Sequence, residues 1–238
     1  MDQPGTFAAH LEELRRRLAI SFLALLIGAG LSLTQAGRLM QWLQQPIAPL
    51  VPRFAYFTPT EPLLAYLKVA MLGGWVLAMP VILGQLWAFV QAGLTAKERA
   101  LGVALICWGS LLFLAGGAFA YFLLLPVSLR VLLGIGSTFL VPIISIDRYL
   151  SFVTSLVFSC GLVFELPIVI VVLAKIGIVT PEWLRQQRPY AILVLAIVAA
   201  VVTPTTDPIN MLLLMAPLVV LYELSIWVAR LVNTRAAK

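Results

Sequence analysis

Charged residues are scarce in this chain, and histidine and cysteine are rarer still. Asp, Glu, Lys and Arg make up 11% of its 238 residues, whereas soluble domains carry about 25%. One histidine, His10, and two separate cysteines are too few for a zinc site, and they leave a serine nucleophile without a base. The HExxH, GxSxG and Walker phosphate-loop motifs are absent from the sequence. The composition therefore predicts neither a soluble protein nor an enzyme, and no metal or other cofactor.

Apolar residues are abundant instead, at 62% of the chain with a mean hydropathy of +1.03. A spanning helix needs about 20 mainly apolar residues. The first apolar run, about 17 residues with no A-x-A-like site after it, is expected to be a span and not a cleaved leader. A fifth, shorter run reaches only about 22 Å and is expected to thin the bilayer or lean on its neighbours. We expect an all-α polytopic membrane protein, one domain over residues 1–238, with six spans. The expected spans are about 18–35, 63–90, 100–125, 150–175, 189–203 and 209–230.

Basic residues in the connecting segments predict the orientation of these spans. With six spans, one side holds Arg15, Arg16, Arg17, Lys97, Arg99, Lys175, Arg185, Arg188, Arg230, Arg235 and Lys238. The other side holds only Arg38, Arg53, Arg130 and Arg148, with Lys68 one to two turns inside the second span. Eleven against four places both termini in the cytoplasm by the positive-inside rule. The basic residues form no stripe interleaved with aromatics, so nucleic acid is not an expected partner.

Two amphipathic stretches on the opposite side are too interrupted to span. These are 37–54, with three prolines, and 127–150. Both suit short helices that lie at the outer interface. We therefore expect a periplasmic cap of short amphipathic helices over the ends of the spans.

A first group of charges lies at the cytoplasmic membrane edge, in HLEELRRR (10–17) and at Glu98 in GLTAKER. Glu13 and Arg17 are four residues apart, in the orientation that stabilises a helix by a few tenths of a kcal/mol. On the residues alone an ordinary solvated helix end is the favoured interpretation of this group, and a binding site is the alternative.

A second group of charges lies inside the predicted spans. Glu223 is within about two turns of Arg230, so its carboxylate is expected to reach the membrane surface. Glu165 is about 15 Å along its helix from Lys175 and cannot do so easily. A charge near the bilayer centre costs about 2.5–3.5 kcal/mol unless it faces protein or water. Glu165 is therefore a candidate functional residue.

The rest of the fourth span supports a polar environment for this carboxylate. Ser151, Thr154, Gly161 and Glu165 fall within about 40° of one helical direction, as a stripe of small and polar residues. Pro167 frees a backbone carbonyl one turn earlier and is expected to kink the helix. We expect Glu165 on the wall of a water-accessible groove, or else protonated and hydrogen-bonded inside the bundle.

Seven stretches in order resemble the TatC family, the large subunit of the twin-arginine protein translocase, over nearly the whole chain. They are HLEELRRR (10–17), FTPTEPLLAYLK (57–68), PVILGQLWAFVQAGLTAKER (80–99), FLAGGAFAYFLLLP (113–126), FELPIV (164–169), TPEWLRQQRPY (180–190) and TDPINMLLLMAPLVVLYELSIW (206–227). The resemblance implies a receptor in the bacterial cytoplasmic membrane for folded cargo whose signal peptide carries two adjacent arginines. It also implies an oligomeric complex with the single-span partners TatA and TatB, driven by the proton motive force.

The resemblance carries residue roles onto matching positions of this chain. It implies a cytoplasmic signal-peptide site with Glu13, Arg15, Phe89 and Glu98. It also places Pro46 of the periplasmic cap at a position sensitive to substitution.

The chain departs from the family where partner helices are expected to dock. Many relatives read T-P-P-D and then Ser-Gln in the sixth span, whereas this chain reads TPTTDPINM over 203–211. Thr203, Asp207 and Asn210 are expected to keep part of that spot polar. Two rival hypotheses remain: a proton-coupled secondary transporter with Glu165 as its carrier, and an assembly scaffold without a substrate. The lack of an internal repeat counts against the transporter, and retention of a twin-arginine peptide would separate all three.

Overall fold

The computed structural model describes residues 7–49, 54–91, 102–134, 143–203 and 208–234, and almost all of them are helical. In chain order the elements are α1 (Phe7–Leu33), α2 (Ala36–Gln44), α3 (Glu61–Val90), α5 (Gly102–Phe119), the π-helical η2 (Ala120–Leu124), α6 (Leu125–Gly134), α7 (Ile146–Phe164), α8 (Leu166–Lys175), α9 (Pro181–Gln186), α10 (Arg188–Val202) and α11 (Pro208–Thr234). The prediction of an all-α polytopic membrane protein is confirmed.

Within the described residues, five helical runs are long and apolar enough to cross a membrane. They are Leu11–Leu33, Glu61–Val90, Gly102–Gly134, Ile146–Lys175 and Asn210–Arg230. The short fifth span of the sequence prediction corresponds to α10, whose 15 residues reach about 22 Å.

The structure corrects the prediction for 127–150. The segment Leu125–Gly134 is not a separate helix at the interface, because it continues the third spanning helix through η2 as one run from Gly102. At the other end of 127–150, Ile146 already begins α7, four residues earlier than expected. Of the two predicted cap helices, 37–54 does contain one, α2.

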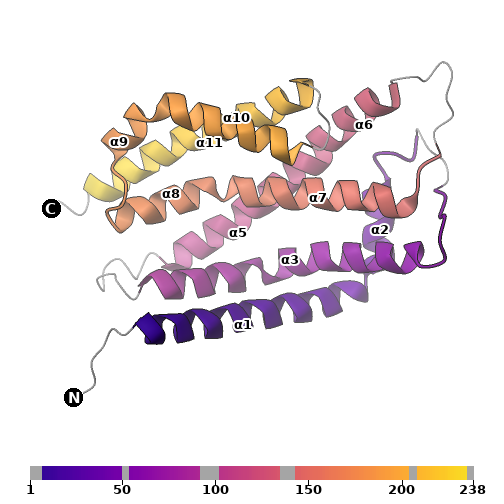
Figure 1. Ribbon diagram of the computed structural model, residues 1–238, viewed down its shortest axis with the longest axis horizontal. Helices are drawn as coiled ribbons and strands as arrows, with labels where there is room; N and C mark the ends of the chain where they lie inside the picture. Colours follow the sequence, from indigo (N-terminus) through magenta and orange to yellow (C-terminus); the bar gives the residue numbers. More distant parts are fainter. Residues whose placement is uncertain (1–6, 50–53, 92–101, 135–142, 204–207, 235–238) are drawn as a thin grey trace.

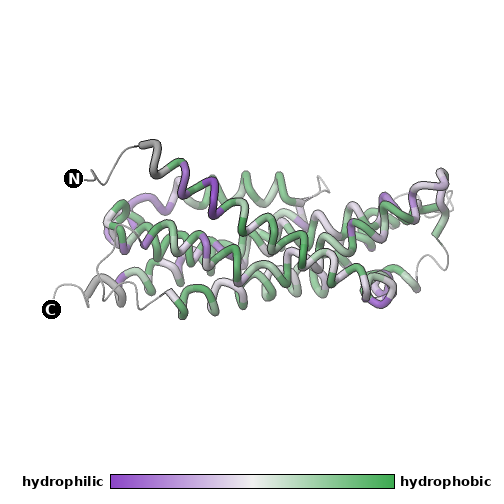
Figure 2. The backbone as a smooth tube through the Cα atoms, turned by 90° about the horizontal axis from the view of Figure 1, so that it is seen from below, coloured by the Kyte–Doolittle hydropathy of each residue, from purple (hydrophilic) through white to green (hydrophobic). Residues whose placement is uncertain are grey.

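The helices form an elongated bundle (Figure 1). α1 and α3 lie side by side along one edge, α7 and α8 form the middle row, and α10 and α11 form the other edge. The α5–η2–α6 run crosses these rows diagonally. α1 begins and α11 ends at the same end of the bundle, and we call the opposite end, with α2 and the starts of α3 and α7, the cap end. Figure 2 shows a mainly hydrophobic body whose hydrophilic residues gather toward the ends.

Glycines allow the closest helix contacts in the bundle. A Cβ atom on Gly74 of α3 would lie 2.7 Å from the backbone nitrogen of Ala29 on α1. A Cβ on Gly116 of α5 would lie 2.6 Å from the carbonyl oxygen of Cys160 on α7. Small residues serve membrane helices in this way, because hydrocarbon gives apolar side chains no reason to associate and close backbone packing does.

Polar contacts hold the cap end together. The Tyr121 and Tyr149 hydroxyls donate to the carbonyls of Trp42 and Leu43, at 2.6 and 2.7 Å. These carbonyls belong to the last turn of α2, and that of Trp42 also accepts from the Gln45 N–H at 3.1 Å. Ala55 exchanges two backbone hydrogen bonds with residues 144 and 146, at 3.1 and 3.0 Å. The segment between α2 and α3 is thereby tied to the start of α7.

Candidate functional site

The first candidate site lies between α1 and α3 near the end of the bundle where α1 begins. Arg17 donates from Nε and Nη2 to Oε1 of Glu13, at 3.1 and 2.5 Å. The second carboxylate oxygen of Glu13, Oε2, accepts no hydrogen bond from the described residues. Both side chains, with Arg16, Ile20 and Gln85 of α3, line a hollow of about 280 Å³. The hollow is the kind of recess that a short polar group of a ligand can enter.

The other residues predicted for this site differ in their location and exposure. Phe89 is half-buried one turn beyond Gln85, on the same face of α3, and so lies on the side that meets α1. Arg15 is exposed and lies 3.9 Å from Glu12. Glu98 lies outside the described residues. The structure therefore brings Glu13 and Phe89 to one corner of the bundle and leaves Arg15 at its surface.

The second candidate site is built around Glu165. α7 ends at Phe164 and α8 begins at Leu166, so Glu165 occupies the break between them. Pro167 accounts for the break, since it lacks an N–H group and its ring fits best in the first turn of a helix. The helix is thus interrupted where a kink was expected.

The Glu165 carboxylate is enclosed but unsatisfied. The residue is 7% exposed, and neither of its side-chain oxygens has a hydrogen-bond partner among the described residues. It lines a cavity of about 380 Å³ whose walls are otherwise almost wholly apolar. Trp87 lines the same cavity, and its indole N–H, packed against Gly102 of α5, is buried without a partner in the described part of the chain. The Glu165 carboxylate lies against Gly109, two turns farther along α5.

The predicted polar stripe of the fourth span is divided in the structure. Ser151 and Thr154 face a groove beside α3, with Lys68, whereas Gly161 packs against the Phe113 ring. The Thr154 hydroxyl donates to the Leu150 carbonyl at 2.6 Å. The stripe therefore serves helix packing at one end and a polar cluster at the other.

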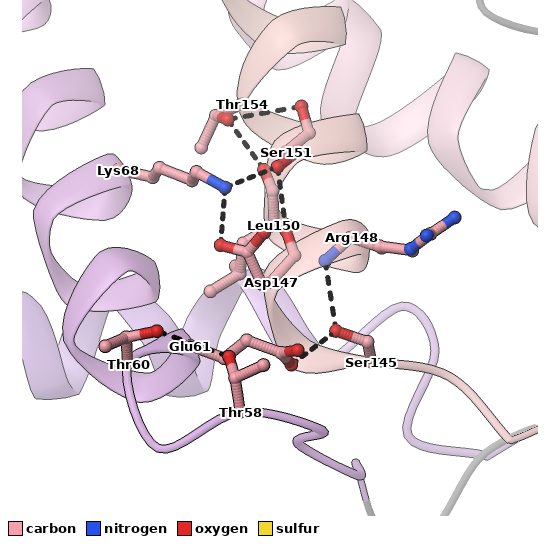
Figure 3. Close-up of polar contacts among 10 residues, drawn as sticks. All are labelled: Thr58, Thr60, Glu61, Lys68, Ser145, Asp147, Arg148, Leu150, Ser151 and Thr154. Atoms are coloured by element: carbon pink, nitrogen blue, oxygen red, sulfur yellow. Dashed lines mark hydrogen bonds and ion pairs between the residues drawn. The ribbon is translucent and has the colours of Figure 1, made fainter.

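Sequence reasoning did not foresee that polar cluster (Figure 3). Lys68 Nζ donates to Asp147 Oδ1 at 2.5 Å and to Ser151 Oγ at 2.7 Å, which joins α3 to α7. Near it, the Ser145 hydroxyl donates to Glu61 Oε2 at 2.7 Å. The charges in the sequence could have indicated this cluster. A lysine inside one span and an aspartate at the start of another cost the least free energy to bury when they form an ion pair.

The cap residue Pro46 lies half-buried in the turn that follows α2. Its neighbour Ile47 is fully buried and belongs to the main hydrophobic core. The turn is therefore packed against the bundle.

The predicted docking residues lie at the ends of α10 and α11. Thr203 is buried where α10 ends, and its hydroxyl donates to the Ala199 carbonyl at 2.8 Å. Asn210 is fully buried in the first turn of α11, and Asp207 lies outside the described residues. Farther along α11, the Glu223 carboxylate is partly exposed and pairs with Arg188 at the start of α10, at 2.6 Å.

Comparison with known proteins identifies relatives of this chain in both sequence and structure. The family model for the Sec-independent protein translocase protein (TatC) matches residues 9–217. The chain is 39% identical over 234 residues to that protein from Carboxydothermus hydrogenoformans, covering 98% of this chain and 96% of the relative. It is 40% identical over 230 residues to the one from Aquifex aeolicus, covering 95% of each. A crystal structure of the twin-arginine translocase receptor TatC superposes with a TM-score of 0.79 at 39% identity, covering 94% of this chain and 99% of that chain.

Proposed function

Because the chain belongs to the TatC family of Sec-independent protein translocase proteins, we propose that it binds twin-arginine signal peptides through the Glu13 corner of α1 and α3. The family makes it a multi-pass inner membrane subunit of a translocase and not an enzyme. In the proposed orientation both termini and this corner face the cytoplasm, where folded cargo carrying such peptides arrives.

The proposal rests on one observation: Arg17 donates to only one of the two carboxylate oxygens of Glu13. Arg17 uses only Oε1, so Oε2 remains available to a guanidinium from a ligand. A guanidinium presents a planar fork of donors to a carboxylate, whereas a lysine ammonium is a point charge and cannot copy that fork. Glu98 is proposed as the acceptor for the second arginine, and Phe89 as an apolar contact beside the pair.

We propose further that the chain nucleates an oligomeric export complex with TatA and TatB, driven by the proton motive force. The cavity of Glu165 supports a place for a partner helix. A polar side chain of that helix, such as an amide, could donate to the Glu165 carboxylate and satisfy it. The buried Thr203 and Asn210 support a second contact, between α10 and α11.

The direct test is the affinity of the purified protein in nanodiscs for a twin-arginine peptide. Glu13→Gln removes one charge-assisted interaction, worth about 1.5–3 kcal/mol, so Kd should rise about 10- to 150-fold. Glu98→Ala should have a similar effect. Glu12→Gln is the matched control, because Glu12 is exposed on the neighbouring position of the same helix and should leave Kd unchanged.

A twin-lysine peptide supplies the second control and should bind the unmodified chain as weakly as the twin-arginine peptide binds Glu13→Gln. A photo-crosslinker at Phe89 should label the twin-arginine peptide alone. Equal affinity of the unmodified chain and the Glu13→Gln, Glu98→Ala double variant would exclude this site. A scaffold or a proton-coupled transporter would show no discrimination between the two peptides.

A further inference from the structure

A groove of about 570 Å³ lies at the cap end, on a face that the proposed function does not use. α1, α2, α3, α5, η2 and α7 all contribute to its walls. Leu31, Trp42, Leu77 and Leu114 are exposed along it, so it opens to the outside of the bundle along its length. Because these helices are embedded in a bilayer, the groove opens to lipid.

The groove runs from the cap end to the middle of the bundle. Along α3 its lining extends from Val69 to Leu77, which is about 12 Å. Leu77 lies about halfway along α3, and Trp42 and Tyr121 lie at the cap end of the groove. The long axis of the groove is therefore roughly parallel to the chains of one leaflet.

Polar groups in this lining are few, and one of them is unsatisfied. Ser32 is 5% exposed, and its hydroxyl has no hydrogen-bond partner among the described residues. The hydroxyl lies beside Gly73, which also lines the groove. Gln35 is exposed near the cap end, one turn beyond Ser32, and Trp42 adds an indole N–H. All three side chains can donate a hydrogen bond.

The size and chemistry of the groove exclude several occupants. Water requires two to four polar partners at each position, and the apolar walls do not offer them. A helix about 10 Å across fills roughly 900 Å³ over a 12 Å length, so it could enter the groove only in part and would leave its depth unfilled. An extended peptide would bring a backbone donor and acceptor at almost every residue, and burying these without partners is costly. A single hydrocarbon chain meets none of these objections.

We propose that the groove binds one phospholipid of the leaflet at the cap end, with one acyl chain lying between α1, α3 and α5. The ester oxygens and headgroup of the lipid lie by Gln35 and Trp42, whose side chains can donate hydrogen bonds to them. Tryptophan is enriched at this depth of the membrane because its ring is apolar and its N–H group is polar. The bound chain fills the space under α2 and so supports the cap.

The test uses a phospholipid with a photoactivatable diazirine in one acyl chain, reconstituted with the full chain in nanodiscs. After irradiation, adducts located by mass spectrometry should concentrate on groove residues such as Leu39, Val76 and Leu114. Gly117→Leu fills the groove: its Cβ would meet only Val157, at 3.3 Å for the nearest side-chain atom, and the remainder extends into the open space. Adduct yield in the groove should then fall at least about fivefold.

Gly30→Leu is the matched control, because Gly30 is exposed with nothing within 4 Å of a Cβ and does not line the groove. Ala118→Leu is a second variant that fills the groove. Ala118 lines the groove and is exposed, so this change should not disturb the core. A folding defect in one of the two filling variants would then not decide the result. Gln35→Leu keeps the groove open and removes a donor at its cap end, and should lower occupancy about two- to tenfold.

Adduct yields that are equal in the unmodified chain and both filling variants would overturn the proposal. So would a twin-arginine peptide that crosslinks to these residues and displaces the lipid. The experiment is independent of the Glu13 corner: Glu13→Gln should leave the lipid adducts unchanged, and Gly117→Leu should leave peptide affinity unchanged.

Discussion

The ion pair between Lys68 and Asp147 is expected to be a major stabilising contact between α3 and α7. Two unit charges 4 Å apart attract by about 4 kcal/mol at an effective dielectric constant of about 20. Desolvation offsets much of this gain, and the side chains remain 33% and 22% exposed, so solvent screens part of the rest. The Ser151 hydroxyl oxygen accepts a second hydrogen bond from the ammonium, at 2.7 Å. We expect a net coupling of about 1–2 kcal/mol, above the 0.2–1 kcal/mol typical of surface pairs.

The four variants of a double-mutant cycle measure this coupling directly. Asp147→Asn leaves the ammonium of Lys68 without its counter-charge one to two turns inside the span, and should cost about 2–3 kcal/mol of unfolding free energy, below the range for fully buried pairs. Lys68→Met should cost less, because Asp147 lies in the first turn of α7, where backbone N–H groups and the helix dipole favour a carboxylate. The double variant should recover part of the loss. The measurement is reversible unfolding in bicelles at fixed lipid composition.

Arg188 and Glu223 provide the matched control for that cycle. Their contact is similarly short, 2.6 Å, but the side chains are 45% and 38% exposed. The same cycle on this pair should give a coupling below about 1 kcal/mol. Additive effects at Lys68 and Asp147, or a coupling no larger than that of Arg188 and Glu223, would refute the argument that burial at the α3–α7 contact sets the strength of the pair.

Three further predictions concern transport. Glu165→Ala should abolish export without lowering thermal stability, since the carboxylate makes no hydrogen bond within the described residues; export at the unmodified level would contradict this, and tolerance of Glu165→Gln alone would show that polarity suffices. Pro46→Ala should impair both export and complex assembly by loosening the turn after α2, and normal levels of both would reduce the cap to a connector. Cysteine pairs between Thr203 and TatA or TatB helices should form disulfides in membranes; their absence, with crosslinks elsewhere, would move the docking site.

The apolar runs predicted the spans, but one boundary was wrong for a physical reason. The predicted third span ends at 125, directly before Pro126, and proline inside a helix clashes with the carbonyl of the residue four positions earlier. In the structure the preceding turn is π-helical, and the Leu125 N–H donates to the Ala120 carbonyl, five residues back. This wider turn makes room for the ring, and the helix continues to Gly134. No periodicity in the sequence announces such a turn.

The candidate site was predictable where it lies within one segment and not where it joins two. Glu13 and Arg17 are four residues apart on one helix, so their contact follows from helical spacing. Gln85 joins them only because α3 packs against α1 in a particular register, set by close contacts such as that of Gly74 with Ala29. That register is a property of the packed bundle, and the sequence pattern of either helix alone does not contain it.

Lys68 and Glu165 show how the fold separates a structural charge from one available for function. Both lie inside spans, and both border the face where α3 meets α7 and α8. Lys68 is satisfied by Asp147 and Ser151, so the fold itself uses its charge. Glu165 is the more deeply buried of the two and has no hydrogen-bond partner in the described part of the chain. An unpaired ionisable group is costly in a membrane, and packing does not require it here, because Leu in place of Glu would suit the apolar walls better. We therefore propose that a polar group of a partner enters this cavity and meets the Glu165 carboxylate.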